Sequence, residues 1–197
     1  MAKKVISHLL RNPESNTRKS VELNDCSEVF FQCLIIFVLT ENKMKQRIYI
    51  DTSVVGGYFD EEFKEATIKL FERLENNEII FVISDLLDLE LINAPQHVRE
   101  HLFKYPANKF ERIELTEEAI QLADKYITEK VVGKTSLEDC RHIAMATIHK
   151  VDVLASWNFK HIVNLDRIKG YNSVNLRLGY SMIEIRSPKD LVNYGNE

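Results

Sequence analysis

The sequence lacks the features that mark small secreted proteins, zinc proteins and membrane proteins. Its three cysteines, Cys26, Cys33 and Cys140, form neither a disulfide framework nor a zinc-ligand cluster, so a reducing, cytoplasmic environment is expected. The longest apolar run, at 29–39, is shorter than the ~20 residues of a membrane span. It also lies too far from the N-terminus to be a secretory signal, so we expect no membrane association.

A basic surplus and a phosphate-binding glycine loop are also missing. The chain has 26 basic and 30 acidic residues, which gives no sign of a general nucleic-acid-binding surface. A metal site or a small basic patch can still supply the local positive charge that phosphate contacts require. The pair Gly56-Gly57 is a weak signal by itself.

The chain changes in character near Met44. Before it, polar stretches surround one apolar run, and after it strand-like and helix-like segments alternate over short connections. We therefore expect an N-terminal extension at 1–43, poorly ordered or not part of the native product, and a folded domain at 44–197. With 45% apolar residues, the chain can bury a core of ordinary size.

The alternating segments predict an α/β protein with a mainly parallel sheet and helices on both faces. Strands are expected at 47–50, 78–83, 110–115, 151–156 and 182–185. Helices are expected at 61–76, 85–94, 95–103, 117–129, 137–150 and 159–168, with a last helical turn from Ser187. In such sheets, ligands bind outside the carboxyl ends of the strands. Polar residues at those ends are therefore the candidates for function.

Asp51 directly follows the first predicted strand, which directs its carboxylate at this crevice. Thr52 and Ser53 can hydrogen-bond that carboxylate, or cap the following turn, and so keep it ionised. A helix N-cap aspartate is the alternative interpretation of the same position.

Glu90 shares an apolar helix face with Leu86, Leu87 and Ala94, where an unpaired charge is unfavourable. A cation beside it would remove that penalty. The alternative is that Glu90 lies at the edge of the apolar stripe and reaches solvent or an arginine.

Asp139 lies three residues after Ser136, in the first turn of its predicted helix. That spacing also resembles a capping box, although the motif prefers Glu or Gln. Glu138 is a competing candidate, but by helical angle it falls near Arg141 and His142. We favour Asp139, which borders the core-facing side of the helix.

Other polar residues are given smaller roles. Asn158 follows the strand at 151–156 and can reach the same crevice, whereas Asp152 begins that strand and is expected to be structural. His97 and His101 are four residues apart on a predicted helix, but they lack the glutamate of a zinc-protease motif. We expect both histidines at the surface.

Carboxylates from three separate elements, meeting at one sheet edge, suit a hard cation such as Mg²⁺ or Mn²⁺. Such an ion can activate a water molecule for attack on phosphorus and stabilise the leaving oxygen.

With these motifs in order, the sequence resembles the PIN-domain ribonuclease family, in particular the VapC-type toxins of type II toxin–antitoxin modules. The matching stretches are IYIDTS at 48–53, Glu90, EDCRHIAMA at 138–146 and VLASWNF at 153–159. The resemblance covers 47–188 and does not extend to 1–43. It implies a PIN-like three-layer α/β/α fold and metal-dependent cleavage of RNA by an endoribonuclease.

The resemblance also implies roles for single residues. It assigns Asp51, Glu90 and Asp139 as catalytic, metal-binding acids, with Thr52 or Ser53 supporting the first. Asn158 departs from the pattern, because many members have a fourth acid there, which favours one firmly held metal ion over two. Backbone-phosphate contacts are expected, with a solvated surface as the alternative for each residue, from Arg141, Lys160 and His161.

The leading hypothesis is thus a ribonuclease toxin neutralised by an antitoxin whose tail occupies the acidic groove. The toxin is expected to form a homodimer, for which Tyr58, Phe59 and Phe63 could supply the contact. A second hypothesis, motivated by Asn158, is a PIN-like module that binds RNA or protein without turnover. A third, weaker one is a phosphotransfer or phosphatase domain with Asp51 as nucleophile.

Overall fold

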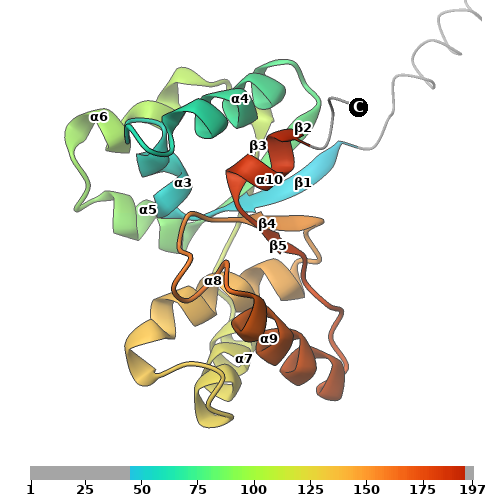
Figure 1. Ribbon diagram of the computed structural model, residues 1–197. Coiled ribbons are helices and arrows are strands. Elements are labelled where there is room, and N and C mark those ends of the chain that lie inside the picture. The colour runs from blue at the N-terminus through green and yellow to red at the C-terminus, as the bar shows by residue number, and fades with distance from the viewer. Residues whose placement is uncertain (1–44, 194–197) are drawn as a thin grey trace, which may run out of the picture. The chain divides into compact units, whose positions relative to one another are not determined.

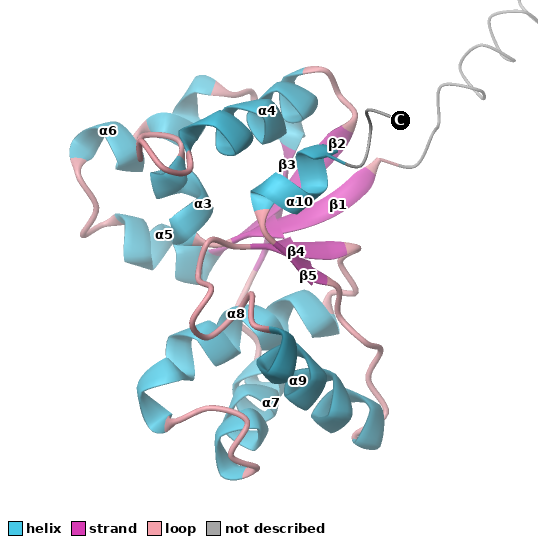
Figure 2. Ribbon diagram, viewed as in Figure 1, coloured by secondary structure: helices cyan, strands magenta, loops and turns pink. Residues whose placement is uncertain are grey.

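The computed structural model describes residues 45–193, which fold around a parallel sheet with the strand order β3-β2-β1-β4-β5. Every neighbouring pair of strands in this sheet is parallel. The strands are β1 (Gln46–Ile50), β2 (Ile79–Ser84), β3 (Phe110–Ile113), β4 (Val153–Ala155) and β5 (Ile185–Arg186). The chain fills one side of β1 with β2 and β3, then crosses to the other side for β4 and β5 (Figure 2).

Helices cover both faces of this sheet (Figure 1). One layer holds α3 (Thr52–Gly57), α4 (Lys64–Glu75), α5 (Asp85–Leu91), α6 (Gln96–Arg99) and α10 (Pro188–Asn193). The other holds α7 (Glu117–Thr128), α8 (Leu137–Ile148) and α9 (Leu165–Arg177). Single 3-10 turns lie at η1 (His101–Lys104), η2 (Ala107–Lys109) and η3 (Lys134–Ser136). The predicted three-layer α/β/α arrangement with a parallel sheet is confirmed.

The central strand β1 supplies side chains to two separate cores. Successive side chains of a strand point to opposite faces. Ile48 and Ile50 therefore pack into the core under α4, whereas Tyr49 packs into the core under α7 and α8. All three side chains are fully buried. A strand buried on both faces is typical of a parallel sheet covered by helices on each side.

The helix starts at Ser84 and Thr116 follow the sequence signals closely. The hydroxyl oxygen of Ser84 accepts a hydrogen bond from the backbone N–H of Leu87, at 3.2 Å. Thr116 does the same for the N–H of Ala119, also at 3.2 Å. Each residue satisfies an N–H group that the first helical turn leaves unpaired.

The helix predicted at 159–168 is wrong in position. Residues 159–162 form a turn, and α9 begins only at Leu165, with Asn164 as its N-cap. The side-chain oxygen of Asn158 accepts from the N–H of His161, and its backbone oxygen accepts from the N–H groups of Ile162 and Val163. The bond to Ile162 has helical spacing, but the bond to Val163 spans five residues and ends this single turn, so a new helix starts after it.

The helix predicted at 95–103 is split into α6 and the 3-10 turn η1, and this changes the environment of His101. His97 is exposed as expected, but the prediction of a surface position for His101 is wrong, because only 1% of this residue is exposed. Its ring lies against Tyr58 and Phe71, with ring centroids 4.0 and 5.0 Å away. Neither ring nitrogen has a hydrogen-bond partner among residues 45–193.

Some expectations fall on parts of the chain outside the described residues. These are the extension at 1–43, the start at Met44 and the positions of Cys26 and Cys33. Within 45–193, no helix combines the length and apolar character that crossing a membrane requires.

The buried ring of His101 predicts a stability that falls with acid. Burial lowers the pKa of His101 from 6.5 to about 4. The unfolded chain therefore binds the extra proton first, so this contribution is complete above pH 6.5 and is lost as the pH falls towards 4. The loss approaches roughly 3 kcal/mol at the acid end, at 1.36 kcal/mol per pKa unit. Urea unfolding between pH 4 and 7 measures it.

The matched variants are His101→Phe and His97→Gln. His101→Phe should flatten the pH dependence of the unfolding free energy between pH 4 and 6.5, whereas His97→Gln should leave it unchanged. An equally steep dependence in His101→Phe would contradict the assignment to this ring.

Candidate metal-binding active site

The three predicted acids lie near the carboxyl ends of the central strands. Asp51 directly follows β1, Glu90 lies in α5, which directly follows β2, and Asp139 lies in the first turn of α8. The register pairs Ile50 with Ala155, so the ends of β1 and β4 are adjacent. This is the point where the chain changes direction across the sheet, and ligands of open parallel sheets bind there.

Asp51 is buried, with 5% of the residue exposed. Its Oδ1 accepts hydrogen bonds from the Ser53 hydroxyl at 2.5 Å and the Val54 backbone N–H at 3.2 Å. Its Oδ2 accepts from the Ser156 hydroxyl, also at 2.5 Å. Asp51 is therefore the N-cap of α3, and its carboxylate lies at the end of β1, where the functional interpretation stays a prediction.

Burial sets the protonation behaviour of two of the acids. It raises the pKa of Asp51 above its ordinary value, against the stabilising effects of His142 and of the hydroxyl donors. Burial also raises the pKa of Asp139, and the negative charges of Asp51 and Glu90 add to this, while His161 and His142 oppose it. Mutual repulsion between acids is a sign that they share one site, where a cation would relieve it.

Glu90 is held by donors on both of its carboxylate oxygens. The Thr52 hydroxyl donates to Oε2, and Nε2 of His142 lies 3.2 Å from Oε1. Burial alone would raise the pKa of Glu90, but the hydrogen bond and charge of His142, helped by Thr52, lower it below the ordinary value. Thr52 thus donates to Glu90 rather than to Asp51. The two donors offset the unfavourable energy that was expected for an unpaired charge on an apolar helix face.

Asp139 is held by the residue that departs from the family pattern. The amide Nδ2 of Asn158 donates to Asp139 Oδ1 at 2.9 Å, which brings these two predicted residues together. The capping-box alternative does not apply, because the Ser136 hydroxyl makes no hydrogen bond among the described residues. Glu138 instead forms an ion pair with Arg141 at 2.7 Å.

Asp152 lies at the other end of β4, as expected for a structural residue. Its Oδ2 accepts a hydrogen bond from the backbone N–H of Arg47 at 2.7 Å, beside the start of β1. The carboxylate thus joins the amino ends of two strands and is remote from the acidic edge.

Two residues of the site were not predicted from the sequence. Ser156 donates to Asp51 and also accepts the N–H of Asn158 at 2.9 Å. The sequence places Ser156 at the end of a strand, but this position points to Asp51 only when β4 is known to lie beside β1. His142 is buried on α8, and its position three residues after Asp139 placed it near the site, but nothing in the sequence paired it with Glu90.

The donor set fits a hard cation that keeps some of its water. All three acids offer oxygen ligands, and two have pKa values raised by burial, a condition that a bound cation relieves. Within residues 45–193, however, no group of three or more Asp, Glu, His or Cys side chains is arranged as a ready-made metal cage. An ion here would take water or substrate oxygens among its ligands, as Mg²⁺ commonly does.

The three candidate phosphate contacts differ in availability. Lys160 is exposed, next to Asn158 in the turn. Arg141 is already paired with Glu138. His161 is half-buried, and its charge lowers the pKa of Asp139. Lys160 is therefore the most accessible cation of this set.

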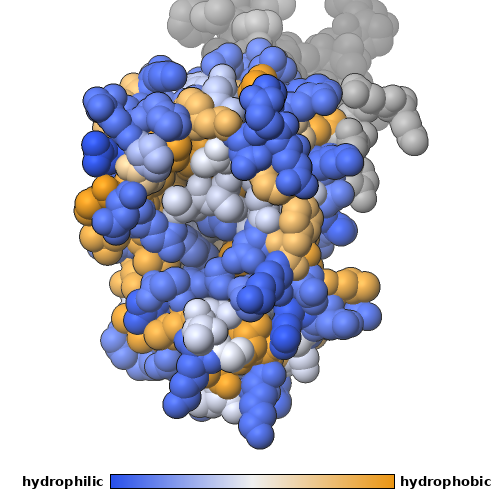
Figure 3. Space-filling model, turned by 60° about the vertical axis from the view of Figure 1, so that its left-hand side comes forward, coloured by the Kyte–Doolittle hydropathy of each residue, from blue (hydrophilic) through white to orange (hydrophobic). Residues whose placement is uncertain are grey.

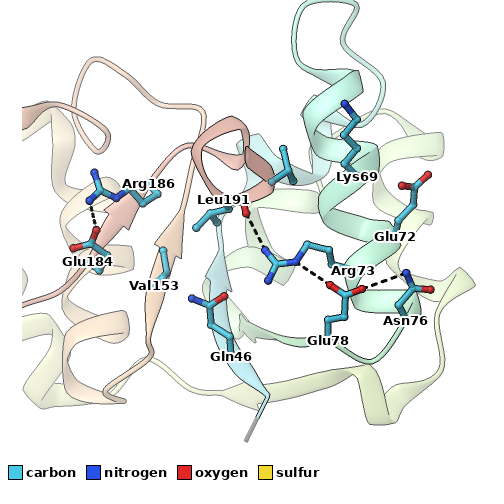
Figure 4. A pocket seen from close by; sticks show the side chains of 11 residues that line it. Gln46, Lys69, Glu72, Arg73, Asn76, Glu78, Val153, Glu184, Arg186 and Leu191 are labelled. Atoms are coloured by element: carbon cyan, nitrogen blue, oxygen red, sulfur yellow. Dashed lines mark hydrogen bonds and ion pairs between the residues drawn. The ribbon is translucent and has the colours of Figure 1, made fainter. Parts of the chain in front are cut away.

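A pocket of about 820 Å³ lies beside the amino ends of β1 and β4, away from the acids (Figure 4). Two ion pairs lie within its lining, Arg73 with Glu78 and Arg186 with Glu184, and Lys69 of the lining pairs with Glu65 outside it. None of the three acids lines this pocket.

The Ser156 contact predicts a measurable coupling to Asp51. Ser156→Ala removes a donor from a buried carboxylate, which should lower the free energy of unfolding by about 1–3 kcal/mol. The loss should be smaller when Asp51→Asn has removed the charge. Urea denaturation of the wild type, both single variants and the double variant gives the coupling energy. Strictly additive effects would show that the contact does not stabilise the carboxylate.

Comparisons with known proteins return solved structures alone. No protein-family model and no curated protein matches the sequence. The chain is similar to a toxin–antitoxin complex from Klebsiella pneumoniae, with 18% identity, a TM-score of 0.43, and 57% of this chain and 88% of that chain covered. It is similar to VapBC2 from Rickettsia felis bound to a promoter DNA fragment, with 12% identity, a TM-score of 0.46 and coverage of 72% and 98%. It is also similar to FitAcB from Neisseria gonorrhoeae, with 14% identity, a TM-score of 0.46, and 72% of this chain and 97% of that chain covered.

Proposed function

We propose that this protein is a metal-dependent endoribonuclease of the PIN type and the toxin of a toxin–antitoxin pair. The observation that carries the proposal is that Asp51, Glu90 and Asp139 lie near the carboxyl ends of the central strands, where the charges of Asp51 and Glu90 act on Asp139 and each carboxylate has named hydrogen-bond donors. The family resemblance of the motifs that contain these acids supports it.

In this proposal the acids hold Mg²⁺ or Mn²⁺, which supplies an activated water and stabilises the charge that develops on the phosphate. The Asp51 carboxylate accepts three hydrogen bonds, so its oxygens would be the most firmly oriented metal ligands of the three acids. Glu90 and Asp139 are only partly buried, which leaves them accessible to solvent and substrate. Rigid placement of such groups contributes to catalysis because the protein need not reorganise during the reaction.

Asn158 supports a single firmly held ion. Its amide brings no charge, and its Nδ2 donates to Asp139. Three carboxylates fully offset the charge of one divalent cation, whereas two such cations carry one positive charge more than three carboxylates bring. A second ion, if one takes part, would then arrive with the substrate phosphate.

Protein partners form part of the proposal. A cognate antitoxin would cover the acidic groove, and the toxin would pair with a second copy of itself in the cytoplasm. The rings suggested for the dimer contact, Tyr58, Phe59 and Phe63, are partly buried against the core. Ile92 and Phe103 are more exposed than these three rings, with 59% and 77% of each residue exposed. On the face in Figure 3, hydrophobic residues form separate groups among hydrophilic ones.

A second candidate function is a module that binds RNA or protein without turnover. The favouring observation is that the uncharged amide of Asn158 donates a hydrogen bond to Asp139 at the position where a fourth acid would strengthen metal binding. The metal-dependent experiment below distinguishes the two functions.

Purified protein should cleave structured RNA in the presence of Mn²⁺ and stop cleaving when EDTA removes the ion. Asp51→Asn and Asp139→Asn should lower the rate at least about 100-fold, because a metal supplies several kcal/mol of transition-state stabilisation and each 1.36 kcal/mol is tenfold. Gel analysis of end-labelled RNA measures the rates.

Glu138→Gln and Asp152→Asn are the matched controls. Glu138 neighbours Asp139 on the same helix, and Asp152 lies at the opposite end of β4. Both variants should cleave within a fewfold of the wild type. Binding of RNA without cleavage, equal in the wild type and Asp51→Asn, would instead establish the second candidate function.

Asn158→Asp tests the fourth position. It replaces the donor to Asp139 with a fourth carboxylate, so repulsion should lower the melting temperature of the metal-free protein. Mn²⁺ should then raise the melting temperature more than it does in the wild type, because a ligand stabilises the state that binds it more tightly. Differential scanning fluorimetry with and without Mn²⁺ measures both effects. An unchanged Mn²⁺ response would mean that residue 158 does not face the ion.

A further inference from the structure

His142 lies between the acidic site and the interior of the protein. The residue is 2% exposed, and it projects from α8 with its two ring nitrogens on different partners. Nε2 is 3.2 Å from Glu90 Oε1, and Nδ1 is 2.7 Å from the hydroxyl of Tyr49. The ring thus connects an acid at the sheet edge to a fully buried tyrosine of the central strand.

The contact to Tyr49 continues into the start of the helix that carries Glu90. The Tyr49 hydroxyl lies 2.8 Å from Ser84 Oγ, and Ser84 Oγ accepts the backbone N–H of Leu87. Ser84 is the N-cap of α5, and Glu90 lies within the same helix. The chain of bonds therefore runs from the cap of α5 through β1 and α8 and returns to α5.

This arrangement fixes the imidazole whichever charge it carries. A neutral ring accepts from Tyr49 at Nδ1 and donates from Nε2, and a protonated ring donates from both nitrogens. In each case Nε2–H faces Glu90 Oε1 as a donor. Thr52 donates to the other carboxylate oxygen, so rotation of the carboxylate would break one bond or the other.

Glu90 depends on such support more than Asp51 does. The Glu90 side chain is 30% exposed, and among residues 45–193 its donors are the Thr52 hydroxyl and the His142 ring. Asp51 is held by two hydroxyls and a backbone N–H in a buried setting. A long glutamate side chain without fixed donors populates several rotamers, and ordering it on metal binding then opposes that binding.

We propose that His142 is a positioning residue that holds the Glu90 carboxylate in the orientation that binds the metal ion, with Tyr49 and Ser84 holding His142. The inference rests on the proposed function, since it takes Glu90 as a metal ligand. Residues that orient a ligand in this way commonly change metal affinity by 10–100-fold when they are replaced.

The test is Mn²⁺ binding to the full-length protein, measured by isothermal titration calorimetry without RNA. His142→Leu removes the donor and keeps an apolar side chain in the buried site, and it should weaken Mn²⁺ binding at least about tenfold. His142→Gln places an amide N–H near the position of Nε2 and should restore affinity to within a fewfold of the wild type. If His142 had a purely structural role, Mn²⁺ affinity would not depend on whether residue 142 can donate a hydrogen bond, and the two variants would bind Mn²⁺ equally.

Tyr49→Phe and Tyr126→Phe are a matched pair of buried variants. The Tyr126 hydroxyl donates to Asn175 at 2.6 Å, in the core that also holds Tyr49, and it makes no hydrogen bond to the three acids. Tyr49→Phe loses two buried contacts, to His142 and Ser84, whereas Tyr126→Phe loses one, so Tyr49→Phe should be the less stable of the two in thermal denaturation. Only Tyr49→Phe, which releases His142, should weaken Mn²⁺ binding. This pair also tests the inference if His142→Leu does not fold.

The outcomes separate the inference from the proposed function. Wild-type Mn²⁺ affinity in folded His142→Leu, or equal affinities in the two tyrosine variants, would overturn the positioning role while RNA cleavage by the wild type continued to support the function. A wild type that neither binds Mn²⁺ nor cleaves RNA would overturn the function and the inference with it. Selective loss in His142→Leu and Tyr49→Phe, with recovery in His142→Gln, supports the positioning role.

Discussion

The acidic edge depends on one arrangement, the buried carboxylate of Asp51 between the ends of two parallel strands. A buried charge is unfavourable unless it is hydrogen-bonded, and the donors come from different parts of the chain. Ser53 and Val54 follow it directly, whereas Ser156 lies at the end of β4. The pairing of β1 with β4 therefore creates the site as well as the centre of the sheet.

The other two acids are held by contacts that link the two helical layers. Glu90 comes from the layer of α4 and α5, and His142 reaches it from α8 in the opposite layer. Asp139 in α8 is held by Asn158 in the turn after β4. Every carboxylate has donors of its own, while burial raises the pKa values of Asp51 and Asp139 and the charges of Asp51 and Glu90 raise that of Asp139 further.

Sequence reasoning succeeded where the signal is local. The strand before Asp51, the caps at Ser84 and Thr116 and the parallel α/β architecture follow from short-range patterns of apolar and capping residues. It failed for the segment after β4, where Asn158 begins a single turn at 159–162 and α9 starts separately at Leu165. It also failed for His101, because the fold packs aromatic rings from distant segments around it.

The sequence by itself determined that the three acids belong to three separate elements, and the rule for parallel sheets gives them a common edge. The tertiary structure alone decided which donors hold each acid. Thr52 supports Glu90 instead of its neighbour Asp51, Ser156 supports Asp51, and His142 joins Glu90 to the core. The physical reason is that these contacts depend on the order of the strands and the packing of α8 across them, and the local sequence does not encode either.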